Sequence, residues 1–124
     1  MGVTYLNVRV KRLPDDPQHE DLEFLVDTGA TYTLAPGSAL TKLGITPHRT
    51  LTLTLADGSQ TSRHMGGAYF EYGGVGGMAP VLFGEPDDAN LLGATALEAM
   101  GLMIDPLSRE LRQLPAMLAR VSIP

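Results

Sequence analysis

The chain has 124 residues, which is enough for one domain with a single hydrophobic core. Its net charge of −5 argues against a nucleic-acid-binding protein, which would carry a basic face, and the lack of cysteine excludes disulfides and thiolate metal sites. Its 14 glycines and 9 prolines favour many short strands joined by turns over long helices.

The first half of the chain has the pattern of short strands separated by turns. Alternating apolar and polar residues predict a half-buried strand over 3–11, and the apolar run 22–26 predicts a second strand. A third strand is expected over 31–36. It is followed by a predicted helix over 38–44, for which Ser38 is the expected N-cap.

The middle of the chain contains two predicted hairpins. Strict alternation over 50–64 surrounds an Asp-Gly pair, which is a strong signal for a tight turn. Two further strands are expected over 67–72 and 78–83, joined by the glycine-rich segment 73–77. This segment is no phosphate loop, because no Lys-Ser/Thr pair follows it.

The last third begins with a short apolar strand and a helix. Thr95 and Glu98 have the spacing of a capping box at the start of this helix. A last hairpin is expected before residue 115, and the apolar tail 115–124 fits a strand or a helix equally well.

A short internal similarity suggests an approximate twofold repeat within the domain. The residues Gly-Ala-Thr occur at 29–31 and again at 93–95, each near an apolar strand and ahead of a short helix. The pattern predicts two related units that each contain a strand, a glycine turn and a helix.

Several function classes have no support in the sequence. His19, His48 and His64 lack the spacing of metal ligands, so neither a metal nor a cofactor is expected. No stretch approaches the ~20 apolar residues of a transmembrane helix, and the first residues do not resemble a signal peptide. We therefore expect a cytoplasmic protein with no membrane partner and no nucleic-acid partner.

The segment FLVDTGAT, residues 24–31, runs an apolar strand directly into Asp27. A charge at the end of an apolar strand is costly unless it is compensated. Asp27 therefore either closes a turn through hydrogen bonds or is placed there for chemistry. A phosphatase-like nucleophile would need a second aspartate two positions later, where Gly29 stands.

Three elements in this order resemble the retropepsin-like aspartic proteases, the retroviral-type single-domain family. They are Asp27-Thr28-Gly29-Ala30 after an apolar strand, the Asp-Gly hairpin, and Leu91-Leu92-Gly93 before a short helix. The resemblance covers residues 3–114. It implies an all-β fold, a closed acid-protease barrel of short strands with one or two short helices and one lobe per chain. The domain then spans 1–114, and 115–124 is a C-terminal tail expected to help dimerisation.

The resemblance also implies an aspartic endopeptidase that acts on peptides or unfolded proteins. Such enzymes activate one water between two carboxylates, of which one is ionised and the other protonated. This chain supplies one such carboxylate and is too short for two lobes, so the second would come from another copy in a homodimer. The implied catalytic residues are Asp27, Thr28 and Gly29.

Substrate contacts are implied for Ala30, for Leu91 and for the hairpin turn Ala56-Asp57-Gly58-Ser59, which would act as a flap over the substrate. The glycine-rich hairpin at 73–77 competes for the flap role. Only one strand and a loop fit between it and Gly93, so the spacing favours the earlier hairpin.

The chain departs from the retroviral pattern in two places, since Thr31-Tyr32 and Ala94 stand where acidic residues and an arginine occur in viral enzymes. Details of the viral dimer are therefore not transferred. Because a fold alone does not establish activity, a non-catalytic retropepsin-fold module for dimerisation or peptide binding is the alternative. Asp57 is expected to be a turn residue, and Asp87 and Asp88 are expected to lie in a solvated loop.

Overall fold

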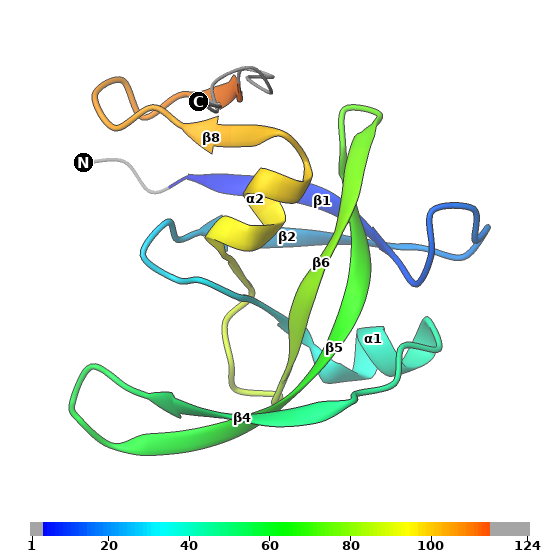
Figure 1. Ribbon diagram of the computed structural model, residues 1–124, viewed down its shortest axis with the longest axis vertical. Helices are drawn as coiled ribbons and strands as arrows, with labels where there is room; N and C mark the ends of the chain where they lie inside the picture. Colours follow the sequence, from blue (N-terminus) through cyan, green and yellow to red (C-terminus); the bar gives the residue numbers. More distant parts are fainter. Residues whose placement is uncertain (1–3, 115–124) are drawn as a thin grey trace, which may run out of the picture.

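The computed structural model describes residues 4–114 and confirms the predicted all-β fold with two short helices (Figure 1). In chain order the elements are β1 (Tyr5–Lys11), β2 (Glu20–Val26), β3 (Thr33–Pro36), α1 (Gly37–Lys42), β4 (Arg49–Thr54), β5 (Gln60–Tyr72), β6 (Val75–Gly84), β7 (Leu91–Leu92), α2 (Ala94–Ala99), β8 (Leu102–Ile104) and β9 (Leu111–Gln113). Neither helix is long and apolar enough to cross a membrane. The predicted tail 115–124 lies outside the described residues.

Seven strands form one sheet in the order β1-β2-β7-β3-β6-β5-β4. Strand β1 also pairs with β5, residues 9–11 against 69–71, so the pairings return to the first strand. Strand β4 pairs only with the beginning of β5. Figure 1 shows these two strands projecting from the rest of the molecule as an arm. We call residues 49–64 the hairpin arm. Strands β8 and β9 form a separate pair.

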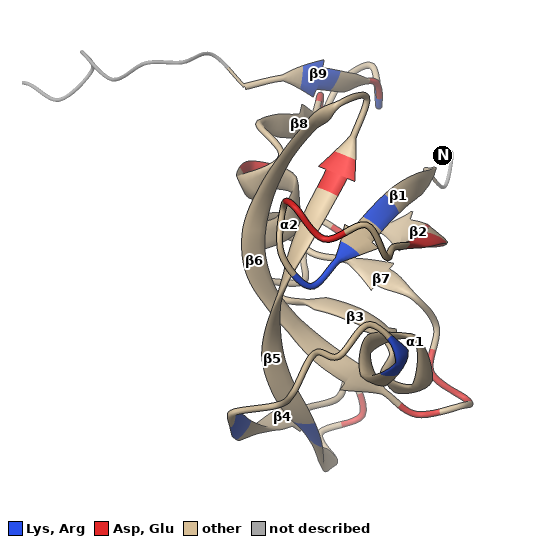
Figure 2. Cartoon of the chain, turned by 90° about the vertical axis from the view of Figure 1, so that its right-hand side faces the viewer, with Lys and Arg blue, Asp and Glu red and all other residues tan. Residues whose placement is uncertain are grey.

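The core forms where the alternation of each strand places its apolar residues. In β1 the side chains of Leu6, Val8 and Val10 are buried and those between them are exposed. Phe24 and Phe70 are fully buried and pack edge to face, with ring centroids 6.5 Å apart. Charged residues lie mainly in the turns and at the strand ends, and β6 carries none (Figure 2).

An internal twofold relates β1-β2-β3-α1 to β5-β6-β7-α2. Strand β2 pairs in parallel with β7, β3 pairs in parallel with β6, and β3 and β7 are antiparallel to each other. Each unit therefore inserts its last strand between the last two strands of the other. The structure thus confirms that two related units exist.

The predicted register of that repeat is wrong. The structure matches Leu34 with Leu91 and the helix α1 with α2. Leu40 and Leu97 are buried at equivalent positions, and Gly44 and Gly101 both have positive φ at the helix ends. The two Gly-Ala-Thr segments are not equivalent in the fold; they hydrogen-bond to each other.

Both predicted helix caps are also wrong. Helix α1 begins at Gly37 with Pro36 as N-cap, so Ser38 lies inside its first turn. Helix α2 has Gly93 as N-cap, and no side chain caps either helix. For α2 the reason is visible, because backbone carbonyls of residues 30 and 31 accept its first N–H groups.

The glycine-rich hairpin is shorter at its turn than predicted. Gly73 and Gly74, both with positive φ, make the turn, and residues 75–77 already belong to β6. Strand β5 runs without a break from Gln60 to Tyr72 through Gly66. A Cβ at Gly66 would lie 3.0 Å from the Thr46 carbonyl oxygen, so this glycine permits close packing instead of ending the strand.

Candidate active site

Asp27 directly follows β2 and is held through its backbone by the neighbouring strand β7. Its N–H donates to the carbonyl of Leu92 at 3.0 Å, and the N–H of Leu25 donates to the carbonyl of Asn90 at 2.9 Å. Strand β7 lies between β2 and β3, so it supports both ends of the loop 27–32. The apolar run before Asp27 is therefore part of β2, a strand paired on both sides, with β1 and with β7.

The Asp27 side chain closes the turn that follows it. Its Oδ1 accepts the N–H of Gly29 at 3.0 Å, and its carbonyl accepts the N–H of Ala30 at 3.1 Å. A Cβ at position 29 would lie 3.3 Å from the same Oδ1, so a larger residue there would press on the Asp27 carboxylate. Asp27 remains partly exposed, and Thr28 and Gly29 are exposed. The carboxylate thus has a fixed position and access to solvent.

The start of α2 completes the support of this loop. The N–H of Ala94 donates to the Ala30 carbonyl at 2.8 Å. The hydroxyl of Thr95 donates to the Thr31 carbonyl at 2.7 Å. A Cβ at Gly93 would lie 2.5 Å from the Tyr32 carbonyl oxygen, a distance that only glycine avoids.

Thr33 is a supporting residue that the sequence did not single out. It is 0% exposed, and its hydroxyl oxygen accepts the N–H of Gly93 at 2.9 Å. A hydroxyl at the first position of a buried strand is a weak signal, because its partner lies 60 residues away.

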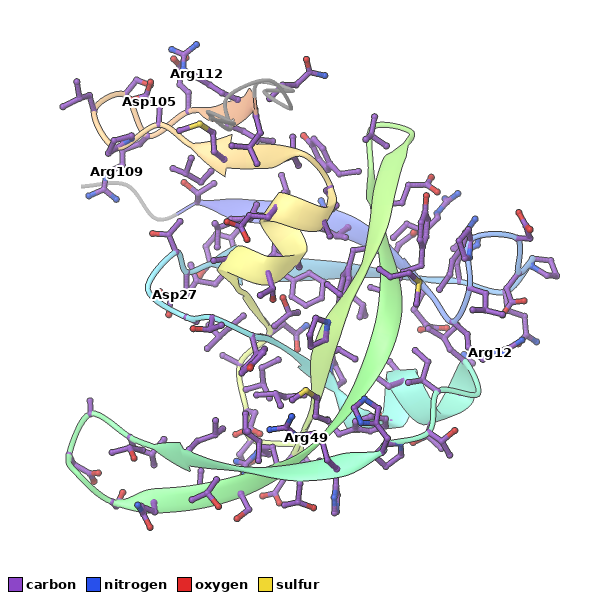
Figure 3. All side chains as sticks on the ribbon, in the orientation of Figure 1. Arg12, Asp27, Arg49, Asp105, Arg109 and Arg112 are labelled. Carbon is purple, nitrogen blue, oxygen red and sulfur yellow. The ribbon has the colours of Figure 1, made fainter. Side chains whose placement is uncertain are left out.

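Two pockets flank the loop. One of about 300 Å³ is lined by Asp27 and Thr28 together with Thr4, Leu25, Val26, Ile104 and Arg109. A second of about 160 Å³ places Thr28 against α2 and β8. Figure 3 shows Asp27 and Arg109 on the same side of the molecule. Arg109 and Ile104 were not predicted as neighbours of Asp27, because only the C-terminal β8–β9 hairpin brings them there.

The predicted turn Ala56-Asp57-Gly58-Ser59 forms the tip of the hairpin arm, and all four residues are exposed. Asp57 is a turn residue as predicted, since its Oδ1 accepts the N–H of Ser59 at 2.9 Å and also the Ser59 hydroxyl. These hydrogen bonds hold the pKa of the Asp57 carboxyl below its usual value. Gly58 has a φ of 86°.

The structure brings some predicted site residues together and leaves others apart. Leu91 lies in β7, partly buried and in register with Leu25 of β2. The tip of the arm points to the same side of the view as the loop 27–32 (Figure 1), but within residues 4–114 no hydrogen bond joins the two. The competing turn at Gly73 instead lines a pocket of about 490 Å³ with residues 111–114.

The loop 85–90 is largely exposed as predicted, and Asp87 is exposed in it, but the Asp88 side chain departs from the prediction. It is only 20% exposed and binds Arg63. Arg63 Nε donates to Asp88 Oδ2 at 2.8 Å and Nη2 donates to Oδ1 at 2.9 Å. The guanidinium lowers the pKa of the Asp88 carboxyl. No local pattern could reveal this pair, since its members are 25 residues apart.

The described part of the chain contains no group of three or more His, Cys, Asp or Glu side chains that could hold a metal ion. At the loop 27–32 the structure places one carboxylate, that of Asp27, with the backbone N–H of Gly29 beside it.

Comparisons with known proteins address the family. A model of a family described as aspartyl protease matches residues 15–96, a segment that includes Asp27, the hairpin arm and Gly93. A comparison with curated proteins found no match. Among solved structures, the solution structure of the simian foamy virus (mac) protease is similar, with 22% identity and a TM-score of 0.49 over 75% of this chain and 92% of that chain. Because the family model covers more than half of the sequence, the chain belongs to the aspartyl protease family.

Proposed function

We propose that the protein is an aspartic endopeptidase that works as a homodimer. In this dimer a water molecule is activated between Asp27 and Asp27 of a second copy, and the substrate is a peptide or an unfolded protein. The observation that carries the proposal is the Asp27 carboxylate itself. It is partly exposed beside a pocket, and backbone hydrogen bonds from β7 and α2 fix its loop.

The chemistry follows from two carboxylates placed close together. Two such groups about 3 Å apart cannot both be ionised, so they share one proton. The ionised carboxylate removes a proton from the water while the water oxygen attacks the peptide carbonyl carbon, and the protonated carboxyl donates its proton to the carbonyl oxygen. When the C–N bond of the resulting diol intermediate breaks, the carboxyl that took the proton from the water gives it to the leaving amine. The other carboxylate takes back a proton from a hydroxyl of the intermediate, which leaves the pair with one shared proton again.

The other residues of the loop have supporting roles in this proposal. The exposed Thr28 hydroxyl reaches the second copy and orients the two loops. Gly29 keeps its backbone close to the Asp27 carboxylate, to which its N–H donates at 3.0 Å. Ala30 and Leu91 contact the substrate. The tail 115–124 adds contacts between the copies.

The hairpin arm is the flap in this proposal. Three observations support that role. The arm extends beyond the ring of strands, its tip lies on the side of the loop 27–32, and Leu55 beside the tip is 48% exposed (Figure 1). A flap of this kind covers the substrate, excludes water and offers backbone hydrogen bonds from residues 56–59.

The first test replaces Asp27 by asparagine. Asn cannot take the proton from water, so cleavage of a fluorescently labelled unfolded protein should fall by about 10³-fold or more. Asp87→Asn is the matched control, because Asp87 is an exposed carboxylate of the loop 85–90. If Asp27→Asn cleaves as well as the parent protein, the assignment of Asp27 fails. A parent protein that dimerises but cleaves nothing would support the non-catalytic module instead.

The second test asks whether both copies supply a carboxylate. Parent protein mixed with an equal amount of Asp27→Asn, after exchange of subunits, leaves one dimer in four with two intact carboxylates. Activity should then be about half of that given by the same amount of parent protein alone. No loss on mixing, together with a monomer in sedimentation experiments, would contradict the dimer.

A further inference from the structure

The hairpin arm has little support of its own. Residues 49–54 pair only with 60–65, and β5 pairs with β6 and β1 only from Met65 onward. A two-stranded hairpin is marginally stable in water when nothing packs on it. The position of the arm therefore depends on whatever side chains connect it to the ring of strands.

Arg63 makes that connection. It lies on β5 opposite Leu51 of β4, in the middle of the arm, and its side chain is only 13% exposed. Its Nη1 donates to Thr61 Oγ1 at 2.9 Å and to the Ser62 carbonyl at 2.8 Å, so the guanidinium is fixed to its own strand. Within residues 4–114, every side-chain hydrogen bond from the arm to another element comes from Arg63 and ends on Asp88.

Asp88 is equally well fixed. In addition to the two donors of Arg63, its Oδ2 accepts the N–H of Glu85 at 2.7 Å, and its own N–H donates to the Glu85 carbonyl at 2.9 Å. Glu85 Oε1 lies 3.9 Å from Arg63 Nη2 and adds a second negative charge. The pair therefore joins the middle of the arm to a loop that its own hydrogen bonds close.

The same short segment also holds Asp27. Four residues after Asp88, the carbonyl of Leu92 accepts the Asp27 N–H, and Asn90 accepts the N–H of Leu25. The hairpin arm and the catalytic loop are thus both attached to residues 85–92. Residues 85–92 thus connect the arm to the Asp27 loop, in addition to the continuous strand β5.

We propose that Arg63 and Asp88 are positioning residues that hold the hairpin arm at the distance from Asp27 at which it can cover a bound substrate. This inference rests on the proposed function, in which the arm covers the substrate. Neither side chain touches the reacting atoms. Their pairing limits the range of arm positions, so that the backbone of residues 56–59 meets a bound peptide without a large search.

The geometry separates this pair from the ordinary surface ion pairs of the molecule. Arg9 and Asp21 also form an ion pair at 3.0 Å, but their side chains are 42% and 58% exposed, and such pairs contribute little. A bidentate ion pair that is shielded from solvent is stronger and more directional than an exposed one. Lysine cannot replace the planar fork of arginine, so Arg63→Lys should keep the charge and lose the positioning.

The experiment measures the motion of the arm directly. Backbone hydrogen exchange is compared for the parent protein, Arg63→Lys, Asp88→Asn and the control Arg9→Gln, all carrying Asp27→Asn so that no self-cleavage occurs. The amides of Leu55 and Gly58 donate hydrogen bonds within the arm. They should exchange at least about tenfold faster in Arg63→Lys and Asp88→Asn than in the parent protein. The amides of Val8 and Phe70 in the ring, and all amides of Arg9→Gln, should be unchanged.

A kinetic measurement on variants with Asp27 intact completes the test. Arg63→Lys and Asp88→Asn should lower kcat/KM for an unfolded protein by about tenfold, and the double variant should lose no more than either single one. Unchanged exchange in the arm overturns the inference, as does equal acceleration in arm and ring. A loosened arm with unchanged kcat/KM also overturns it. If the parent protein cleaves nothing, the proposed function fails, and the exchange data alone still decide whether the pair positions the arm.

Discussion

The loops 27–32 and 85–90 occupy equivalent places in the internal twofold and span the same number of residues. Each connects the second and third strands of its unit, and each carries a carboxylate, Asp27 in one and Asp88 in the other. The Asp27 oxygen accepts a backbone N–H and stays accessible beside a pocket. The Asp88 oxygens accept a guanidinium and a backbone N–H and are mostly shielded.

The two loops show that equivalent connections of the fold can place a carboxylate in different surroundings. A carboxylate that is held by backbone hydrogen bonds and open to water is available for chemistry. A carboxylate that is neutralised by a bidentate arginine instead fixes one segment of the chain to another. What decides between the two is the neighbour that each loop meets. The loop 27–32 packs on the backbone of β7 and α2, and the loop 85–90 packs against the hairpin arm.

The largest effect on stability is expected from Gly93→Ala, which disturbs the packing of the loop 27–32 on α2 and leaves the loop 85–90 unchanged. The added Cβ would lie 2.5 Å from the Tyr32 carbonyl oxygen, so the loop must move away from α2. We expect the free energy of unfolding to fall by about 3 kcal/mol or more, measured by urea denaturation. Gly67→Ala is the control, because its Cβ would meet no atom within 4 Å. Equal losses for both variants would contradict the close approach.

Thr33→Val tests the same loop through a single hydrogen bond. Valine keeps the shape of the buried side chain but leaves the Gly93 N–H without its acceptor, which should cost about 2 kcal/mol. Thr33→Ser retains the hydroxyl oxygen and should cost less than Thr33→Val. Thermal unfolding of the two variants compares them, and the opposite ranking would show that the methyl group matters more than the hydrogen bond.

Replacing each carboxylate by its amide should separate the two loops. Asp88→Asn weakens the hydrogen bonds to a shielded guanidinium and should lower the free energy of unfolding by about 1.5 kcal/mol. Asp27→Asn keeps an oxygen for the Gly29 N–H and should change it by less than about 0.5 kcal/mol. If Asp27→Asn is the more destabilised protein, the contrast between an open and an anchoring carboxylate is wrong.

The smallest effect concerns pH. The pairing with Arg63 lowers the pKa of Asp88, so its contribution to stability is fully present above the ordinary aspartate value of about 3.9 and is lost as the pH falls through the lower folded-state value. The stability difference between the parent protein and Asp88→Asn should be the same at pH 7 and pH 5. It should shrink only below about pH 3.9. Asp57 and Asp105, whose pKa values are also lowered, occur in both proteins and cancel. A difference that has vanished by pH 5 would contradict this assignment.

Local patterns in the sequence predicted what depends on near neighbours. The alternation of β1, the Asp-Gly turn of the arm and the last hairpin are all set by residues close in the chain, and the structure confirms each. The motif at Asp27 could likewise be recognised from the sequence, because an apolar strand, a carboxylate and a glycine follow one another closely.

Contacts between distant residues could not be predicted. The caps of α2 were wrong because carbonyls of the loop 27–32 replace the side chains that the local spacing suggested. The repeat register was wrong because it was based on the identical Gly-Ala-Thr triplets at 29–31 and 93–95. The residues that are equivalent in the fold are the buried Leu40 and Leu97. The shielding of the Asp88 side chain was not predicted because its partner, Arg63, belongs to another hairpin.

The two-residue strand β7 has a consequence for how the protein folds. It pairs with Leu25 and Leu34, which lie far earlier in the chain, whereas the hairpins β1–β2, β4–β5 and β5–β6 join neighbouring segments. Contacts between segments that are distant in sequence form slowly, because a large loop must first be closed. We therefore expect the hairpins to form early and the insertion of β7 to come late. During synthesis, the hydrogen bond from the Asp27 N–H to the Leu92 carbonyl can form only after Leu92 has emerged, so the loop 27–32 takes its final shape only then.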